Sequence, residues 1–168
     1  MRVALFIYTI MINVRIKIGD GAIEDTFAAH KLIYIDADNR TEAPIKKRDV
    51  TSYAEKAGDN TDPRTVQDAF DYKVQFVIDG QDKDLKRVNS IIAAFNKKLY
   101  TQPANSDIRT YKEVTFYNDF KPHKIVGLPE PIAECKEFKK SKNGYEFAQV
   151  ELVIHVSDPK KCNFEKSV

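Results

Sequence analysis

The stretch that decides the fold is FDYKVQFVIDGQDKDLKRVNSIIAAFNKKL, residues 70–99. Its first part alternates, with Phe70, Tyr72, Val74, Phe76 and Ile78 separated by mostly polar residues. A period of two predicts a strand with one buried face. Each of these large apolar side chains stabilises the fold by roughly 1.5–3 kcal/mol when fully buried. We therefore expect this strand to drive the packing of a sheet.

The second part of the stretch changes to a helical period. Apolar residues recur at steps of three, three, one, three and four, which places one apolar stripe along about four turns. Asp82 and Asp84 precede the stripe and Lys97 and Lys98 end it, as the helix dipole favours. The stripe consists of Leu85, Val88, Ile91, Ile92, Phe95 and Leu99. One amphipathic helix is therefore predicted at about residues 84–99.

Further strands are predicted on both sides of this stretch. They cover residues 12–18, 32–35, 112–117, 123–128, 132–138 and 147–156, and Val50 and Tyr53 are expected to begin an edge strand. Asn143-Gly144 predicts a hairpin turn, and Pro159 follows the last strand because proline cannot donate to a ladder. Residues 55–68 are polar, contain both glycine and proline, and predict a long exposed loop.

These elements predict an α+β fold that is mainly β. We expect an antiparallel β-sandwich or strongly twisted sheet with the single amphipathic helix packed on it. The length of 168 residues fits one domain, residues 1–168. Apolar residues make up 42% of the sequence, which suffices for a substantial core.

The apolar run at residues 3–11 allows three interpretations. It is a buried strand or ordered N-terminal arm, a signal sequence, or the result of a start that truly lies at Met11. No small-residue cleavage site follows the run, and the run is far shorter than the ~20 residues of a membrane span. We expect an arm or extra strand at residues 1–11, and no association with membranes.

Charge and cysteine content exclude several classes of protein. The 27 basic and 25 acidic residues give a net charge of +2, which argues against a dedicated nucleic-acid surface. The lysine-rich stretches at residues 46–48 and 136–142 are interpreted as solvated loops. With two cysteines, Cys135 and Cys162, we expect free thiols in a reducing compartment.

The sequence contains no recognisable catalytic motif. His30, His123 and His155 lie far apart in the chain, without the close-spaced partners of a metal site. A phosphate-binding glycine loop and a nucleophile elbow are both missing from the sequence. The acidic pairs Asp36/Asp38 and Asp59/Asp62 are interpreted as solvated turns. We therefore expect no enzyme activity, no catalytic residues, no metal and no cofactor.

Aromatic residues gather between residues 100 and 120. Tyr100, Tyr111, Tyr117 and Phe120 stand beside charged residues, and aromatic side chains are enriched in protein interfaces. These four residues are the candidate interface. The alternative is ordinary packing of core and rim.

The order of elements resembles the N-terminal, ring-forming domain of phage distal tail proteins. The resemblance covers roughly residues 50–160. It rests on the strand 70–78, the helix 85–99, the segments VTFYND at 114–119 and KIVG at 124–127, and the last strand closing on Asp158-Pro159. The segment DNTDPRT at 59–65 is similar to tail proteins carried by prophages of Bacteroides-type bacteria.

This resemblance implies a structural role without chemistry. Family members form rings that join the tail tube to the baseplate, so the implied partners are further copies of the chain and other tail proteins. The implied location is the virion tail, assembled in the bacterial cytoplasm. The sequence departs from the family in its apolar N-terminal run and shows no appended carbohydrate-binding domain, so ring formation rather than receptor binding is the role that carries over. The alternative is a non-catalytic β-sandwich binding module of a bacterial cell envelope that recognises a peptide or glycan.

Overall fold

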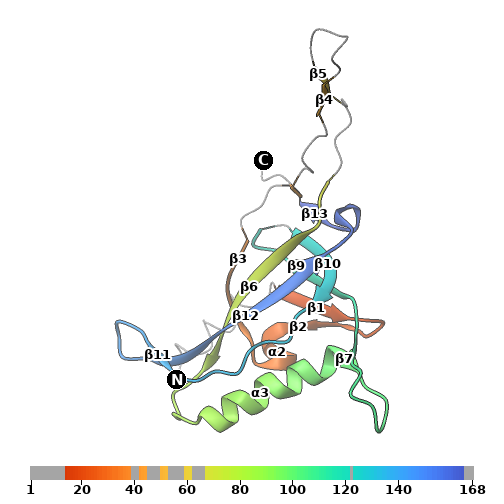
Figure 1. The fold of residues 1–168 in the computed structure, drawn as a ribbon. Helices are drawn as coiled ribbons and strands as arrows, with labels where there is room; N and C mark the ends of the chain where they lie inside the picture. Colours follow the sequence, from red (N-terminus) through yellow and green to blue (C-terminus); the bar gives the residue numbers. More distant parts are fainter. Residues whose placement is uncertain are drawn as a thin grey trace.

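Antiparallel strands and one long helix make up the computed structural model (Figure 1). The structure describes residues 14–38, 42–44, 50–52, 59–61, 67–121 and 123–164. The predicted arm at residues 1–11 lies outside these ranges. The strands are β1 (Val14–Ile18), β2 (Ile23–Asp25), β3 (Ile33–Ala37), β4 (Val50–Ser52), β5 (Asp59–Thr61), β6 (Phe70–Asp79), β7 (Tyr100–Thr101), β8 (Thr110–Tyr111), β9 (Val114–Asn118), β10 (His123–Pro129), β11 (Lys139–Lys140), β12 (Glu146–Val156) and β13 (Asn163–Phe164). The helices are α2 (Thr26–His30), α3 (Leu85–Lys98) and the 3-10 turn η1 (Pro159–Lys161).

The predicted fold class is confirmed. The main sheet runs in the order β2-β1-β9-β10-β12-β6-β3, with every neighbouring pair antiparallel. β11 adds to β12 and β13 adds to β10, while β4–β5 and β7–β8 form separate hairpins. Among the described residues, α3 is the one long helix.

The longest ladder joins β6 and β12. Ten residue pairs connect them, from Phe70 opposite Val156 to Asp79 opposite Phe147. Both strands alternate as predicted, with Tyr72, Val74 and Phe76 of β6 buried. The hydrophobic pattern therefore fixes which face of this pair points inward.

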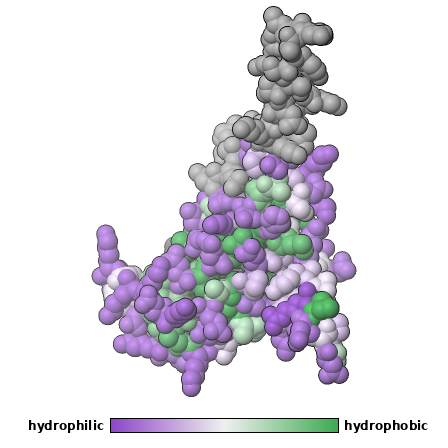
Figure 2. Space-filling model, viewed as in Figure 1, coloured by the Kyte–Doolittle hydropathy of each residue, from purple (hydrophilic) through white to green (hydrophobic). Residues whose placement is uncertain are grey.

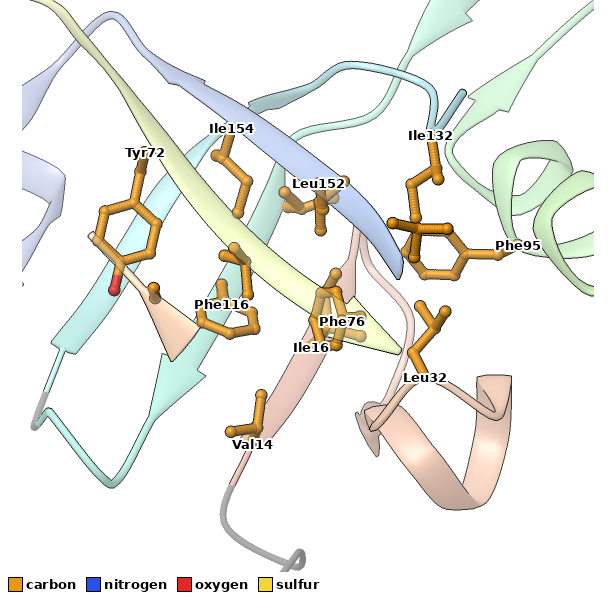
Figure 3. Packing of buried hydrophobic residues seen from close by; sticks show 14 of the residues in the cluster. Val14, Ile16, Leu32, Tyr72, Phe76, Phe95, Phe116, Ile132, Leu152 and Ile154 are labelled. Atoms are coloured by element: carbon orange, nitrogen blue, oxygen red, sulfur yellow. The ribbon is translucent and has the colours of Figure 1, made fainter. Parts of the chain in front are cut away.

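The sheet folds over so that its two halves face each other across one core. Phe116 of β9 contacts Tyr72 and Phe76 of β6 through their rings, with centroids 6.2 and 6.4 Å apart. Figure 3 shows these side chains converging with Val14 and Ile16 of β1, so the two halves of the sheet enclose a shared apolar cluster. β10 passes from one half to the other: it pairs with β9 along most of its length and with β12 only at Leu128 and Pro129.

Gly127 lies where the backbone of β10 closely approaches that of β12. A Cβ at this position would lie 2.4 Å from the carbonyl oxygen of His155 and 2.9 Å from Cγ2 of Ile154. No side chain fits at that distance, so glycine is required for the two strands to meet.

Helix α3 covers one end of the core. Asp84 caps it by accepting hydrogen bonds from the backbone N–H groups of Lys86 and Arg87. Val88, Ile92 and Phe95 of the predicted stripe are buried, and Leu99 follows them. Phe95 also packs edge-on against His30 of α2, with ring centroids 5.0 Å apart. The predicted boundaries of this helix are thus confirmed to within a residue.

The prediction of a strand at residues 132–138 is wrong. This segment lies beside α3, and two helix asparagines bind its backbone in place of a neighbouring strand. Asn96 donates to the carbonyl of Ile132 and accepts from its N–H, both at 2.8 Å. Asn89 makes the same pair of bonds with Cys135, at 3.0 and 2.8 Å. The amide side chains satisfy the backbone groups that a ladder would otherwise satisfy.

The predicted loop at residues 55–68 also needs correction. Residues 59–61 form β5, which pairs with β4 at residues 50–52, so part of the stretch is a hairpin strand. Residues 55–58 and 62–66 lie outside the described residues. Polar residues such as those of β5 carry little alternation, which is why periodicity does not reveal a short, paired strand here.

Within the described part of the chain, no helix is both long and apolar enough to cross a bilayer.

Candidate functional site

The four aromatic residues predicted as an interface do not form one patch. Tyr100 and Tyr111 are cross-strand partners in the β7–β8 hairpin, and their rings meet edge to face at 5.7 Å. Tyr117 lies on β9, and Phe120 lies in the turn that follows it. Among the ring contacts described, none joins the first pair to the second. The structure therefore separates the Tyr100–Tyr111 pair from Tyr117 and from Phe120.

The first group, which we call the loop patch, consists of Tyr100, Ile108, Arg109 and Tyr111. The Arg109 guanidinium lies over the Tyr100 ring, 4.5 Å from its centroid. Such a cation–π contact is worth about 0.5–1 kcal/mol at an exposed site. Ile108 is 72% exposed, the highest value among the exposed large apolar side chains that the structure describes.

The loop between β7 and β8 is held by its own hydrogen bonds. Gln102 donates from its side chain to the carbonyl of Ser106 at 2.6 Å and accepts from Nε of Arg109 at 3.2 Å. The Ser106 backbone N–H donates to the Pro103 carbonyl, and its hydroxyl accepts from the N–H of Ile108 at 3.1 Å. Ile108 is thus presented to solvent by a braced loop.

The second group, which we call the turn patch, consists of Tyr34, Phe120 and Lys121. Tyr117 does not belong to it, because Asn118 is the β9 residue that reaches Tyr34 and its neighbour Tyr117 points to the opposite face of the strand. Phe120 is 48% exposed and stacks parallel on Tyr34, with centroids 5.5 Å apart. Tyr34 in turn accepts a hydrogen bond from the Asn118 side chain at 3.0 Å. Tyr117 is half-buried because Arg15, its cross-strand partner, lies over its ring at 5.3 Å.

Lys121 stabilises the turn patch through one ion pair and one hydrogen bond. Lys121 donates to Asp36 at 2.7 Å and to the carbonyl of Ala37, which ties the β9–β10 turn to the edge strand β3. The hydrogen bond from Lys121 holds the pKa of the Asp36 carboxyl below its usual value. β3 also has a bulge between Tyr34 and Asp36. A bulge and a lysine at an edge strand both disfavour pairing with a further strand.

The two patches lie at opposite ends of β9. Tyr111 precedes this strand and Phe120 follows it, and an extended strand rises about 3.3 Å per residue. In Figure 1 the loop patch is marked by β7, at the C-terminal end of α3, and the turn patch lies toward the opposite end, near β13. The patches also differ in composition, because the loop patch centres on an aliphatic side chain and the turn patch on stacked rings.

Three of the shallow hollows lined by described residues have volumes of about 260–290 Å³. The largest, which we call the acidic hollow, lies between residues 130–134 and the outer face of β12. Its rim carries Glu130, Glu134 and Glu151, and Pro131, Ala133 and Val153 supply apolar surface. The other two hollows contain lysines instead: Lys83 and Lys140 in one, Lys98 and Lys112 in the other. The face drawn in Figure 2 is mainly hydrophilic, with apolar residues toward its centre.

The three histidines occupy unrelated environments. His123 is buried, and its Nδ1 lies 2.8 Å from the Tyr72 hydroxyl. Burial raises the pKa of Tyr72, so this phenol stays protonated as a partner inside the core. His155 is exposed on β12 as predicted, with Nδ1 2.7 Å from Asp71.

His30 is buried between α2 and α3. Its Nε2 lies 2.9 Å from a carboxylate oxygen of Glu24, in poor alignment for a hydrogen bond. Burial lowers the pKa of His30, Lys98 lowers it further, and Glu24 raises it. Within the described ranges, no three His, Cys, Asp or Glu side chains come together as a metal site.

Both cysteines are free thiols. Burial raises the pKa of the Cys162 thiol, which opposes formation of a reactive thiolate. Cys135 donates to the carbonyl of Glu137 at 3.0 Å. It lies in the segment beside α3, where we expected the middle of a strand.

Four residues of the two patches were missed by sequence reasoning: Tyr34, Ile108, Arg109 and Lys121. Tyr34 and Lys121 belong to the turn patch only because β3 and the β9–β10 turn meet in three dimensions. Ile108 had a visible signal, since it is a single aliphatic residue within the polar stretch PANSDIRT at residues 103–110. An isolated isoleucine in such a loop has no local core to enter.

In comparisons with known proteins, neither a protein-family model nor a curated protein sequence matches this chain.

Proposed function

We propose that this chain is a structural subunit of a phage or prophage tail that assembles with copies of itself into a ring or hub between tail tube and baseplate. The proposal combines the resemblance in element order with one geometric observation. Two unlike patches that contain exposed apolar side chains lie at opposite ends of β9. The role requires no cofactor, and the subunit would function in the virion tail after assembly in the bacterial cytoplasm.

Unlike patches at opposite ends favour head-to-tail assembly. In a contact between identical patches, two subunits satisfy each other and assembly stops at a dimer. When two different surfaces meet, each subunit keeps one surface of each kind available, and the chain of subunits grows until the rotation closes a ring. Other tail proteins would bind whatever surfaces the ring leaves exposed.

The first test is the mass of the purified chain in solution. We expect light scattering at micromolar concentration to give a mass above the 19.2 kDa of one chain. A monomer at every salt concentration tried would contradict the proposal. If such a monomer instead bound peptides or glycans, the binding-module hypothesis would replace it.

A further inference from the structure

Ile108 is exposed and does not belong to the hydrophobic core of the described residues. Its side chain is 72% exposed, so it fills no hollow of the molecule that carries it. The loop is nevertheless braced by the Gln102, Ser106 and Arg109 hydrogen bonds, which hold the isoleucine in one place. A rigid loop that presents an apolar side chain loses little conformational entropy when it binds.

Arg109 places a positive charge beside this isoleucine. The Arg109 Nε donates to Gln102 and the guanidinium lies over the Tyr100 ring, so its charge is held on the same loop as Ile108. We call Ile108 and Arg109 the knob. Its ideal partner is an apolar hollow with negative charge at the rim.

The acidic hollow has this chemistry. Pro131, Ala133 and Val153 supply apolar walls, and Glu130 and Glu134 make no ion pair among the described residues. Its volume of about 290 Å³ equals the liquid volume of roughly ten waters at about 30 Å³ each, enough room for a branched aliphatic side chain.

The hollow is also preformed. The N–H of Glu130 donates to the carbonyl of Val153 at 2.8 Å, which fastens one end of the wall to β12. Asn96 holds Ile132 from the other side through two hydrogen bonds. The wall therefore keeps its shape without a ligand.

We propose that the knob of one copy docks in the acidic hollow of the next copy. This inference rests on the proposed self-assembly, and it assigns the acidic hollow rather than the turn patch as the partner of the loop patch. The other surfaces fit Arg109 less well, because the two remaining hollows contain lysines and the turn patch carries Lys121. Since knob and hollow are different surfaces, the contact is head-to-tail.

Charge reversal tests the contact. We expect Arg109→Glu and Glu134→Arg each to weaken self-association at least tenfold, measured by sedimentation velocity across a concentration series, as truncation of an interface anchor does. The double variant restores attraction with the signs exchanged, so association returns toward the wild-type value. Ile108→Ser should weaken it by a similar factor, whereas Ile23→Ser and Lys142→Glu serve as exposed controls without effect.

A mixing experiment gives a second readout. The Arg109→Glu chain keeps an intact hollow and the Glu134→Arg chain keeps an intact knob. An equimolar mixture should therefore form mixed oligomers that neither variant forms alone, in which the wild-type pair alternates with the charge-exchanged pair. Circular dichroism of each variant checks that the fold is retained.

The outcomes separate this contact from the proposed function. An oligomeric wild type that neither reversal weakens would overturn the knob-and-hollow contact and leave self-assembly standing. The contact is also overturned if the double variant associates no better than the single variants. That result is expected when the two residues do not touch, because their separate effects on the free energy of association would add. A wild type that stays monomeric contradicts both proposals.

Discussion

Gly127 shows how one residue permits β10 to join the two halves of the sheet. Only at Leu128 and Pro129 does β10 pair with β12, and the backbone of Gly127 lies against the carbonyl of His155 just before that point. A methyl group here would sit 2.4 Å from the carbonyl oxygen, so one strand must shift. We predict that Gly127→Ala lowers the free energy of unfolding by roughly 1–3 kcal/mol, as overpacking typically does.

Urea denaturation measures this effect through the transition midpoint at constant slope. Leu128→Ala is the matched control, because Leu128 is 46% exposed and its truncation leaves no buried cavity. Equal midpoints for the glycine variant and the wild type would show that β10 can move away from β12 without cost.

His30 makes the stability of the fold depend on pH. Its folded-state pKa is lowered from 6.5 by burial and by Lys98, while Glu24 opposes the shift. As the pH falls through about 6.5, the unfolded chain takes up a proton that the folded chain resists. The free energy of unfolding therefore falls with decreasing pH, by at most about 1.4 kcal/mol per pH unit for this one proton.

Urea titrations at several pH values between 7.5 and 5.5 should show this decline, and His30→Gln should flatten it. Glu24→Gln removes the group that raises the pKa, so the decline should extend to lower pH than in the wild type. A wild-type slope that survives unchanged in His30→Gln would assign the effect to another group.

At the scale of elements, α3 depends on its polar flank as well as on its apolar stripe. Asn89 and Asn96 are two turns apart on one face of the helix. Their side-chain amides make the backbone hydrogen bonds with residues 132–135 that a neighbouring strand would otherwise make. We predict that Asn96→Ala destabilises the protein by about 1–3 kcal/mol, because two hydrogen bonds are lost and two backbone groups lose their partners.

Ser90→Ala is the control for this prediction. Ser90 lies on the exposed face of the same helix and bonds only the carbonyl of Lys86 one turn away. Its replacement should change stability within about 0.5 kcal/mol. If Asn96→Ala were equally mild in chemical denaturation, water would satisfy the Ile132 backbone as well as the amide does.

The sequence predicts those elements whose partners are close or whose pattern is strong. β6, α3, β12 and the turn at Gly144 follow from alternation, helical period and Asn-Gly chemistry, and Gly144 indeed has a φ of 77°. The segment 132–138 has the composition of a strand, yet its hydrogen-bond partners lie on a helix about forty residues earlier. Local pattern cannot reveal a partner so distant in the chain.

The same limit applies to the candidate surfaces. The four aromatic residues predicted for the interface are close in sequence, but the structure separates them. Tyr100 and Tyr111 lie before β9, Phe120 follows it, and Tyr117 contacts Arg15 on the neighbouring strand. The acidic hollow combines residues 130–134 with β12, and its charge emerges only when the two are side by side. The composition of one stretch therefore indicates that it carries interface residues, but it does not show which of these residues lie together on the surface.

At the scale of the whole molecule, a knob and a hollow on one rigid body have a consequence for the distribution of oligomers. An open chain of subunits gains one contact for each subunit added. The subunit that closes a ring gains a second contact while losing translational freedom only once. Closed rings should therefore be favoured over every shorter open chain, provided that the rotation between neighbours closes.

We accordingly predict two dominant species, the monomer and one closed ring, with few intermediates. Mass photometry of a dilution series should show the ring converting to monomer as the concentration falls. The Arg109→Glu chain should remain monomeric throughout, because it lacks one half of each contact. A ladder of masses rising by 19.2 kDa would indicate contacts that do not close, and continued growth with concentration would indicate a filament. Either result would contradict a ring while retaining the head-to-tail contact, so the distribution tests the geometry of assembly separately from its chemistry.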